Sequence, residues 1–350
     1  MKKMNYKMTI CIGLLSASTL SSCVQRKQEM NRPTLGNAKR NYNRNQKKFV
    51  IGTVCAGLLA TSAISGGIMY ATSKPLPSNN TDLCNLLATD QLATALDWST
   101  CNSSSIDTGI QNVINSTANM NKTCGPYRDT LLMNATANGC IDGMKRLINN
   151  KVDLNQKNQE GYTAVMYAVE DNNIDALKLL IENQADLNKQ NNAGTTPLMK
   201  AVINNNLYIT TLLIGNQADL NIKDNTEKSS LIHASKLNRV GIATLLIQHN
   251  ADLNIKDHNG TTALMYAISY GTIVKLLIDS GADLDAQDNT GQTALMHAVI
   301  NNRIDSVKLL IEKKANLKVK DKYRNTALMY ASQYGKTEIK HLLQEALSHN

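Results

Sequence analysis

A repeat with a period of 33 residues constrains the fold of this chain more than any other feature. The pattern T-A-L-M-x-A returns seven times, and its last residue is Ala135, Ala168, Ala201, Ala234, Ala267, Ala298 and Ala331. The intervals are 33 residues, except for one of 31 between the fifth and sixth copies. A second pattern close to A-D-L-N follows six of the copies at the same intervals. A fixed period of this length is typical of stacked supersecondary units that bury their apolar faces against one another.

Each unit predicts a helix, a reverse turn and a second helix. A hydroxyl residue suited to an N-cap stands five residues before each marker alanine: Thr130 (or Asp129), Thr163, Thr196, Ser229, Thr262, Thr293 and Thr326. Glycine or asparagine, which enter the left-handed region most easily, stands four residues after it: Gly139, Asn172, Asn205, Asn238, Gly271, Asn302 and Gly335. Apolar stripes such as Leu179-Leu180-Ile181 then predict the second helix.

Residues 126–350 resemble the ankyrin-repeat family, as in DHNGTTALMYA (257–267) and SGADLDAQDNTGQTALMHA (280–298). The resemblance implies an all-α solenoid of helix-turn-helix units with β-turn loops. It also implies binding of other proteins through the turn tips and the concave helix face. No nucleophile, phosphate-binding or zinc-protease motif occurs, so we expect no enzymatic activity, cofactor or metal.

The chain departs from the family pattern in two kinds of position. The family's T-P-L-H is here mostly T-A-L-M, so the histidine that ties the loop gives way to a column of core methionines, with Ile232 in the fourth unit. The glycine before the A-D pair survives only as Gly281; left-handed positions with Gln184, Gln217, Asn250 and Lys314 each cost about 1 kcal/mol. Glu227 and Arg324 replace turn glycines, which predicts looser tips in the fourth and seventh units.

The fifth unit and the two ends are also irregular. The fifth unit lacks two residues between Gly271 and Val274, which predicts a shortened second helix and a local change of twist. Arg146 and Gln344 stand at stripe positions that are apolar in the second unit. Polar residues there are expected on the outer faces of terminal units.

Variable positions on the regular frame are our candidates for partner binding. One set precedes the marker alanine on the first helix: Tyr167, Lys200, His233, Tyr266, His297 and Tyr330. A second set lies at the loop tips: His258, Tyr323 and Arg324. Tyrosine is a favoured anchor at protein interfaces.

The N-terminal part of the chain predicts membrane attachment. Residues 49–73 form an uncharged run that is long enough to cross a bilayer as a helix. The preceding residues 25–48 are strongly basic, which favours a cytoplasmic N-terminal tail and repeats on the other side. Residues 1–48 carry eleven Lys or Arg and one Glu, so the folded bulk is nearly neutral and a nucleic-acid partner is not expected.

A second membrane signal competes with the first. Residues 1–24 resemble a secretory signal that ends in Leu20-Ser21-Ser22-Cys23, similar to a bacterial lipobox, which makes Cys23 a lipidation candidate. A lipidated Cys23 would place the basic segment outside, and translation from Met30 would remove this signal altogether. The sequence leaves these alternatives open.

Residues 74–125 predict a linker with short helices. Four cysteines, Cys84, Cys101, Cys124 and Cys140, lie in or near this segment and allow three disulfide pairings or none. We therefore expect a membrane-anchored protein that binds an unidentified protein partner, with no small-molecule substrate. The rival interpretations are an exported effector or toxin-like protein that uses its repeats for targeting, and a structural anchor without a specific partner.

Overall fold

The computed structural model describes residue 121 and residues 127–349, in which the chain forms seven helix pairs. The first helices are α6 (Leu131–Ala137), α8 (Ala164–Glu170), α10 (Pro197–Ile203), α12 (Ser230–Lys236), α14 (Ala263–Ala267), α16 (Ala294–Ile300) and α18 (Ala327–Gln333). The second helices are α7 (Ile141–Asn149), α9 (Ile174–Glu182), α11 (Leu207–Gly215), α13 (Val240–Gln248), α15 (Gly271–Asp279), α17 (Ile304–Glu312) and α19 (Thr337–Ser348). We number the units one to seven in this order.

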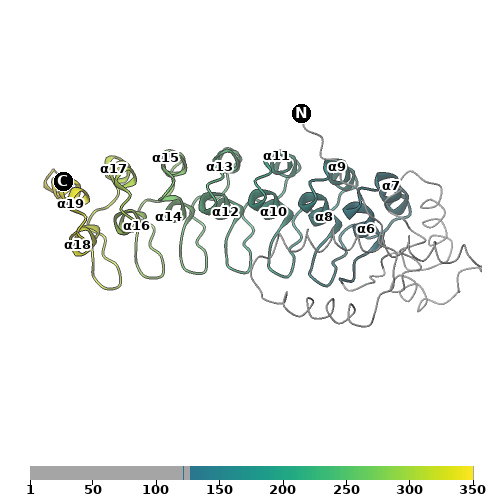
Figure 1. The fold of residues 1–350 in the computed structure, drawn as a ribbon, viewed down its shortest axis with the longest axis horizontal. Coiled ribbons are helices and arrows are strands. Elements are labelled where there is room, and N and C mark those ends of the chain that lie inside the picture. Colours follow the sequence, from purple (N-terminus) through teal and green to yellow (C-terminus); the bar gives the residue numbers. More distant parts are fainter. Residues whose placement is uncertain (1–120, 122–126, 350) are drawn as a thin grey trace, which may run out of the picture. The chain divides into compact units, whose positions relative to one another are not determined.

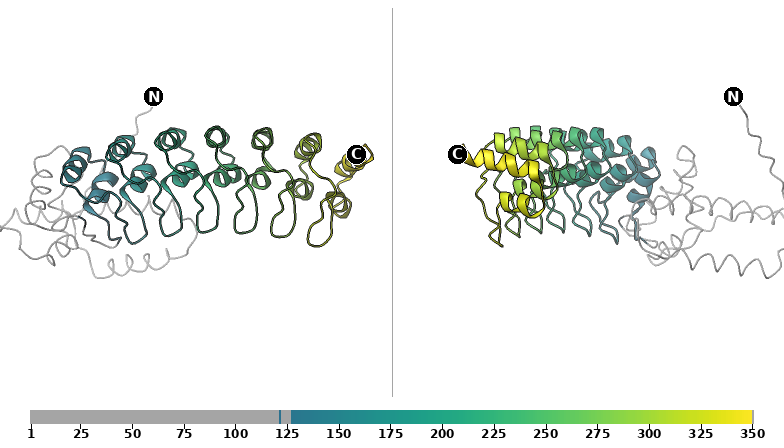
Figure 2. Two further views of the ribbon diagram at one scale, coloured as in Figure 1. Left: turned by 180° about the vertical axis from the view of Figure 1, so that it is seen from behind. Right: turned by 60° about the vertical axis from the view of Figure 1, so that its left-hand side comes forward.

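The helices of the described residues lie in two rows. First helices contact first helices and second helices contact second helices of the next unit, and the loops between units project from the first-helix row (Figure 1). The two rows stay distinct from other directions (Figure 2). The all-helical repeat fold predicted from the sequence is confirmed for this part of the chain.

Hydroxyl side chains begin the first helix of every unit, as predicted. Thr130, rather than Asp129, caps α6, and its hydroxyl accepts a hydrogen bond from the backbone N–H of Met133. Equivalent caps begin the other six first helices: Thr163, Thr196, Ser229, Thr262, Thr293 and Thr326. Each cap satisfies one amide that has no partner inside the helix.

Left-handed residues end the first helix in six units, as predicted. Gly139, Asn172, Asn205, Asn238, Asn302 and Gly335 all have φ between 54° and 71°. The next residue then donates its N–H to the carbonyl of the marker alanine; one example is the 2.8 Å bond from Asn173 to Ala168. This bond closes the helix end and sends the chain back toward the second helix.

The prediction of a shortened second helix in unit five was wrong, because the first helix is the shorter one. The second helix α15 has nine residues, like α9, whereas the first helix α14 has only five and the other first helices have seven. Gly271 is therefore the first residue of α15 and not a left-handed turn. The deletion shortens α14 and not α15, because a shorter α15 would withdraw Ile273 and Leu277, which are fully buried, from the core.

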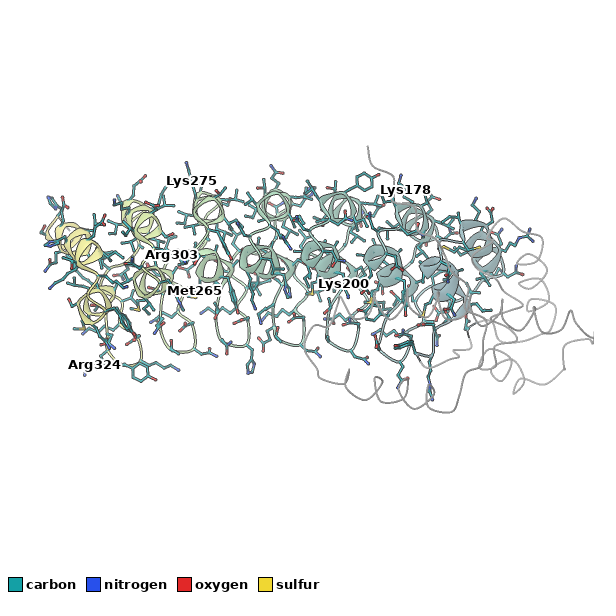
Figure 3. All side chains as sticks on the ribbon, in the orientation of Figure 1. Lys178, Lys200, Met265, Lys275, Arg303 and Arg324 are labelled. Atoms are coloured by element: carbon teal, nitrogen blue, oxygen red, sulfur yellow. The ribbon has the colours of Figure 1, made fainter. Side chains whose placement is uncertain are left out.

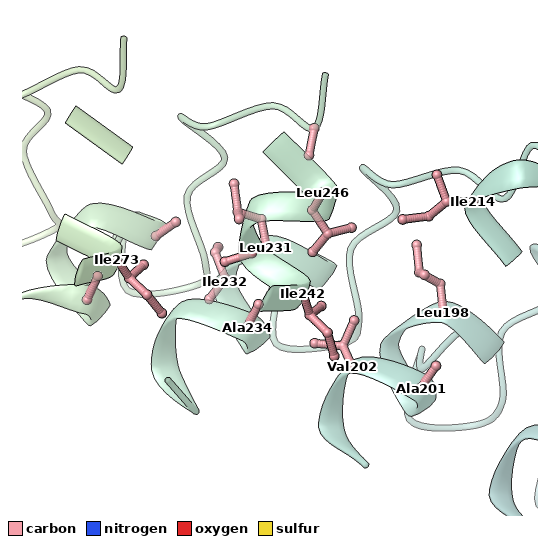
Figure 4. Close-up of a cluster of buried hydrophobic side chains, with 14 of the residues drawn as sticks. Leu198, Ala201, Val202, Ile214, Leu231, Ile232, Ala234, Ile242, Leu246 and Ile273 are labelled. Atoms are coloured by element: carbon pink, nitrogen blue, oxygen red, sulfur yellow. The ribbon is translucent and has the colours of Figure 1, made fainter. Parts of the chain in front are cut away.

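The core is mainly aliphatic and forms one cluster through the stack, and Figure 4 shows the part of it that lies in units three to five. The methionine column belongs to it, as predicted: Met133, Met166, Met199, Met265 and Met296 are at most 6% exposed. Met329 is 51% exposed, since no further helix pair follows α19 within the described residues. Each methionine is thus covered by the unit that comes after it.

Several residues other than glycine occupy the left-handed region, as predicted. Gln184, Gln217, Asn250 and Lys314 have φ between 62° and 64° at the ends of second helices. The tip residues Glu227 and Arg324 have φ of 60° and 68°, and their N–H groups still close the turn onto the carbonyls of Asp224 and Asp321. The turn geometry is therefore kept in units four and seven, and the looser motion of their tips stays a prediction.

A hydrogen-bond ladder joins the loops of neighbouring units. The side-chain oxygen of Asn188 accepts the backbone N–H of Asp219 in the next loop, at 2.9 Å. The same rung, an asparagine or aspartate oxygen bound by the following loop, occurs from Asn155, Asn221, Asn254 and Asp285. Asn121 makes an earlier rung with Asp153, so the ladder begins before α6. The repeated Asp-Leu-Asn thus serves to join the loops of neighbouring units.

Polar residues occupy the predicted positions at both ends of the stack. Arg146 on α7 and Gln344 on α19 are both exposed. Within residues 121 and 127–349 no helix is long and apolar enough to cross a membrane. The predicted membrane helix 49–73, the signal-like segment with Cys23, and Cys84, Cys101 and Cys124 lie outside the described residues. Cys140 is fully buried at the start of α7.

Candidate functional site

The candidate residues that precede the marker alanine tie the loop tips to the first helices. The hydroxyl of Tyr266 donates to Oδ2 of Asp257 at 2.7 Å, and these residues are nine positions apart. The same spacing joins Tyr330 to Asp321, and the Nε2 atoms of His233 and His297 lie 2.8 and 2.9 Å from Asp224 and Asp288. Four of the six candidates therefore share one internal contact.

The aspartate in each of these pairs also shapes the turn of its loop. Oδ1 of Asp257 accepts the backbone N–H groups of Asn259 and Thr261, both at 2.9 Å. Asp224, Asp288 and Asp321 accept from the residues two and four positions later in the same way. One carboxylate thus fixes the turn with one oxygen and binds the first helix with the other, so the tip has a single shape.

The electrostatics of these pairs follow from burial and from donated hydrogen bonds. Burial alone would raise the pKa of Asp257, but the hydroxyl of Tyr266 and two backbone N–H groups hold it below its usual value. The pKa of Asp224 and that of Asp288 are lowered in the same way, against the effect of burial. Burial and then Asp257 raise the pKa of Tyr266. The aspartates are therefore charged acceptors near neutral pH.

Burial acts in opposite directions on the pKa of His233 and on the pKa of its partner Asp224. Burial lowers the pKa of His233 below its usual value, although Asp224 opposes this shift. The imidazole on α12 is thus kept neutral, and its Nε2 binds the carboxylate of Asp224. The hydroxyl of Thr226 donates to the same carboxylate at 2.6 Å.

The two remaining first-helix candidates bind the preceding unit. The hydroxyl of Tyr167 donates to Asp129 at 2.8 Å and accepts from Asn158 at 3.2 Å. The ammonium of Lys200 lies 3.5 Å from Glu170 and 4.9 Å from the ring centroid of Tyr162. Both side chains are buried. Their polar ends are occupied inside the protein, whereas His233, Tyr266 and His297 are partly exposed.

These ties correct one inference about the loops. The sequence pattern indicated that the tie is lost where methionine replaces the family's histidine. The structure shows instead that the residue after the methionine binds the loop through a hydrogen bond, as Tyr266 binds Asp257. The signal was present in the sequence as an aspartate nine residues before the tyrosine or histidine.

The tip candidates lie at the free ends of the loops. His258, Tyr323 and Arg324 are exposed, and Tyr323 is the most exposed large apolar side chain of the described residues, at 75%. Arg324 points away from the helices at the last loop (Figure 3). Adjacent tips are joined by one backbone bond each, such as the 3.0 Å bond from the N–H of Lys322 to the carbonyl of Thr290. The tips therefore form one connected row.

In the second-helix row, α11 exposes two large apolar side chains that the sequence pattern did not predict. Lys178 on α9 and Lys275 on α15 point outward from this row (Figure 3), whereas α11 and α13 carry no charged residue. Leu207 and Tyr208 on α11 are 50% and 53% exposed. The apolar residues of α11 are spread nearly uniformly around the helix. The sequence therefore does not indicate which side of α11 packs on the neighbouring units and which side is exposed.

The described residues hold no metal-binding cluster of three or more histidine, cysteine or acidic side chains.

Comparisons with known proteins agree with this architecture. A family model described as ankyrin repeats (3 copies) matches residues 68–191, 132–224, 174–257, 198–288, 231–321 and 270–350. The crystal structure of the ankyrin repeat domain of Bcl-3, a member of the IkappaB protein family, is similar with a TM-score of 0.55 and 24% identity. That match covers 58% of this chain and 93% of the other, and it shows the fold. No curated protein sequence matches significantly.

Proposed function

This chain belongs to the ankyrin-repeat family, and from that premise we propose that its repeats bind a protein partner through the row of loop tips and hold that partner at a membrane. Ankyrin repeats are interaction scaffolds, and their stacked units present extended binding surfaces. The observation that carries the proposal is the ordered row of tips, each fixed by the side-chain oxygen of an asparagine or aspartate and linked to the next tip. A surface that is ordered before binding loses little conformational entropy when the partner arrives.

The membrane part of the proposal is supported by the sequence. Residues 49–73 are uncharged and are flanked by a basic segment on the N-terminal side. Anchoring would raise the local concentration of a partner that is also at the membrane. The repeats would then recruit or retain this partner.

The binding part is tested by crosslinking in cells that express the full chain. We expect a crosslinked partner that is lost when His258, Tyr323 and Arg324 are replaced together by alanine, because these side chains are exposed at the tips. The matched control replaces Lys178, Lys275 and Lys308 on the second-helix row, which are also exposed. Loss of the partner in the control but not in the tip variant would reject the tips as the binding surface.

The membrane part is tested separately by the mass of the mature N-terminus from native membranes. A lipid-modified peptide that begins at Cys23 would identify a lipoprotein. An unmodified N-terminus together with resistance to alkaline extraction would identify residues 49–73 as the anchor. Full release of the intact chain by alkaline extraction would contradict membrane attachment.

A further inference from the structure

The loop between α17 and α18, residues 313–326, differs from every other loop of the stack in its charge. It carries six cations (five Lys and one Arg) and one acid, or +5, whereas the equivalent loop before it, residues 280–293, carries three Asp, or −3. The four earlier loops of the same length range from 0 to −1. The basic charge is therefore concentrated at the last loop.

Most of this charge is free to meet a ligand. The single acid, Asp321, is 5% exposed and is bound to Tyr330 and to backbone N–H groups. Lys313 pairs with Asp279 at 2.7 Å. Within the described residues no carboxylate pairs with the other five cations: Lys314, Lys318, Lys320, Lys322 and Arg324. An exposed cluster of like charges attracts an acidic ligand.

The backbone at this tip offers a hydrogen-bond acceptor. In each earlier unit a tip carbonyl accepts an N–H from the next tip, and the series runs through Glu160, Ala193, Thr226, Asn259 and Thr290. The next carbonyl in register is that of Tyr323, and within the described residues no following tip donates to it. An extended chain that donates an N–H to this carbonyl would continue the row, as in strand addition.

The side-chain ladder shows what does not fit at this end. Asn316 donates its N–H to Asp285, and the next rung would need an acceptor at position 318. Lys318 stands where the other loops have Asn or Asp, and an ammonium group cannot accept a hydrogen bond. Another repeat unit therefore could not extend the ladder, which argues against a second copy stacked on this end.

We infer that the last loop binds an extended acidic segment of a partner protein. Lys320, Lys322 and Arg324 bind its carboxylates, the carbonyl of Tyr323 accepts a backbone N–H, and the ring of Tyr323 packs on an apolar side chain. This inference rests on the proposed function and adds the chemistry of the partner.

The test measures binding of the full chain to a labelled short peptide in which Glu alternates with Thr around one central Leu. We expect saturable binding that weakens by about tenfold when Lys320, Lys322 and Arg324 are all replaced by Gln. Replacing Lys157, Lys178 and Lys275 by Gln changes the net charge equally and should leave the affinity within twofold, as the charges lie elsewhere. Thermal unfolding of both variants checks that each is folded.

Two further probes separate the partner classes. Two further versions of the peptide carry N-methyl groups on the odd-numbered or on the even-numbered residues. One of the two should bind more weakly than the other, because it lacks the N–H group that donates to the carbonyl of Tyr323. Vesicles rich in phosphatidylserine, duplex DNA and self-association of the chain are tested in parallel. Binding of any of these that exceeds the peptide's and is lost in the Lys320, Lys322 and Arg324 variant would overturn the inference in favour of that ligand.

The inference and the proposed function can fail independently. If the partner found by crosslinking is still bound by the Lys320, Lys322 and Arg324 variant, the inference is wrong and the proposed function stands. If no tip variant changes partner binding, the proposed function itself is wrong.

Discussion

Single side chains decide the shape of each loop tip in this protein. Asp257 is 3% exposed and receives two backbone N–H groups, the hydroxyl of Tyr266 and, at 3.6 Å, the ammonium of Lys228. A buried carboxylate is stable only when its oxygens are satisfied in this way. Removal of one of these donors is therefore expected to lower the free energy of unfolding.

Replacement of Tyr266 by Phe tests this directly. The substitution keeps the ring and deletes the donor to the charged Asp257, so we expect the free energy of unfolding to fall by about 1.5–3 kcal/mol. Urea denaturation of the full chain measures the change. Tyr208→Phe is the control, because that hydroxyl lies on a half-exposed side chain, and it should change stability little. Equal effects of the two substitutions would show that the tie to Asp257 does not stabilise the tip.

The pair of His233 and Asp224 predicts a pH dependence. The pKa of His233 is lowered in the folded protein relative to its usual value of 6.5. The unfolded chain therefore binds a proton first as the pH falls, and this contribution to stability is present above pH 6.5 and is lost below it. Replacement of His233 by Tyr, the residue of unit five, should make stability less sensitive to acid between pH 7 and 5. An unchanged pH profile in this variant would contradict the assignment.

At the scale of the helices, unit five shows how the stack absorbs a deletion. The short α14 ends at Ala267, and the carbonyl of the next residue, Ile268, is buried near α17. The hydroxyl of Ser306 on α17 donates to this carbonyl at 2.9 Å, across 38 residues of sequence. Ser306 thus replaces a partner that a full-length helix end would have supplied.

Replacement of Ser306 by Ala should therefore destabilise the protein. The carbonyl of Ile268 would be left buried without its donor, and the expected cost is about 1–3 kcal/mol. Thermal unfolding followed by circular dichroism measures it, and Ser332→Ala on the exposed side of α18 is the control. If both variants unfold at the temperature of the parent chain, Ser306 has no structural role.

The sequence predicts features that depend on neighbours along the chain. The N-cap hydroxyls and six left-handed turn residues were correct, because each depends on the chemistry of one helix end. Gly271 was wrong, because a glycine suits a turn locally, whereas the placement of the deletion was decided by burial of α15. The ties of the first-helix candidates were missed since they join residues nine positions apart, and Met329 is exposed only because of its place in the stack.

At the scale of the whole stack, coverage by the next unit predicts chemical reactivity. Met329 is 51% exposed, whereas the other methionines of the column are nearly buried. Under mild peroxide, Met329 should be oxidised first, before Met166 and Met296, because sulfur oxidation follows exposure. Mass spectrometry of the digested chain measures the order. Oxidation of all three at one rate, in the folded protein, would show that the stack opens as a whole.

The ladder of loops has a mechanical consequence. Each rung joins only adjacent units, so a force applied along the stack passes through all junctions in series and the least-packed junction yields first. That junction lies between units five and six, because α14 and α16 pack less closely than any other two neighbouring first helices of the described residues. In an optical trap, the first extension step should therefore separate two blocks on either side of residues 280–293. The force needed to open this junction would then set the largest force that the folded stack can transmit to a partner bound at one end.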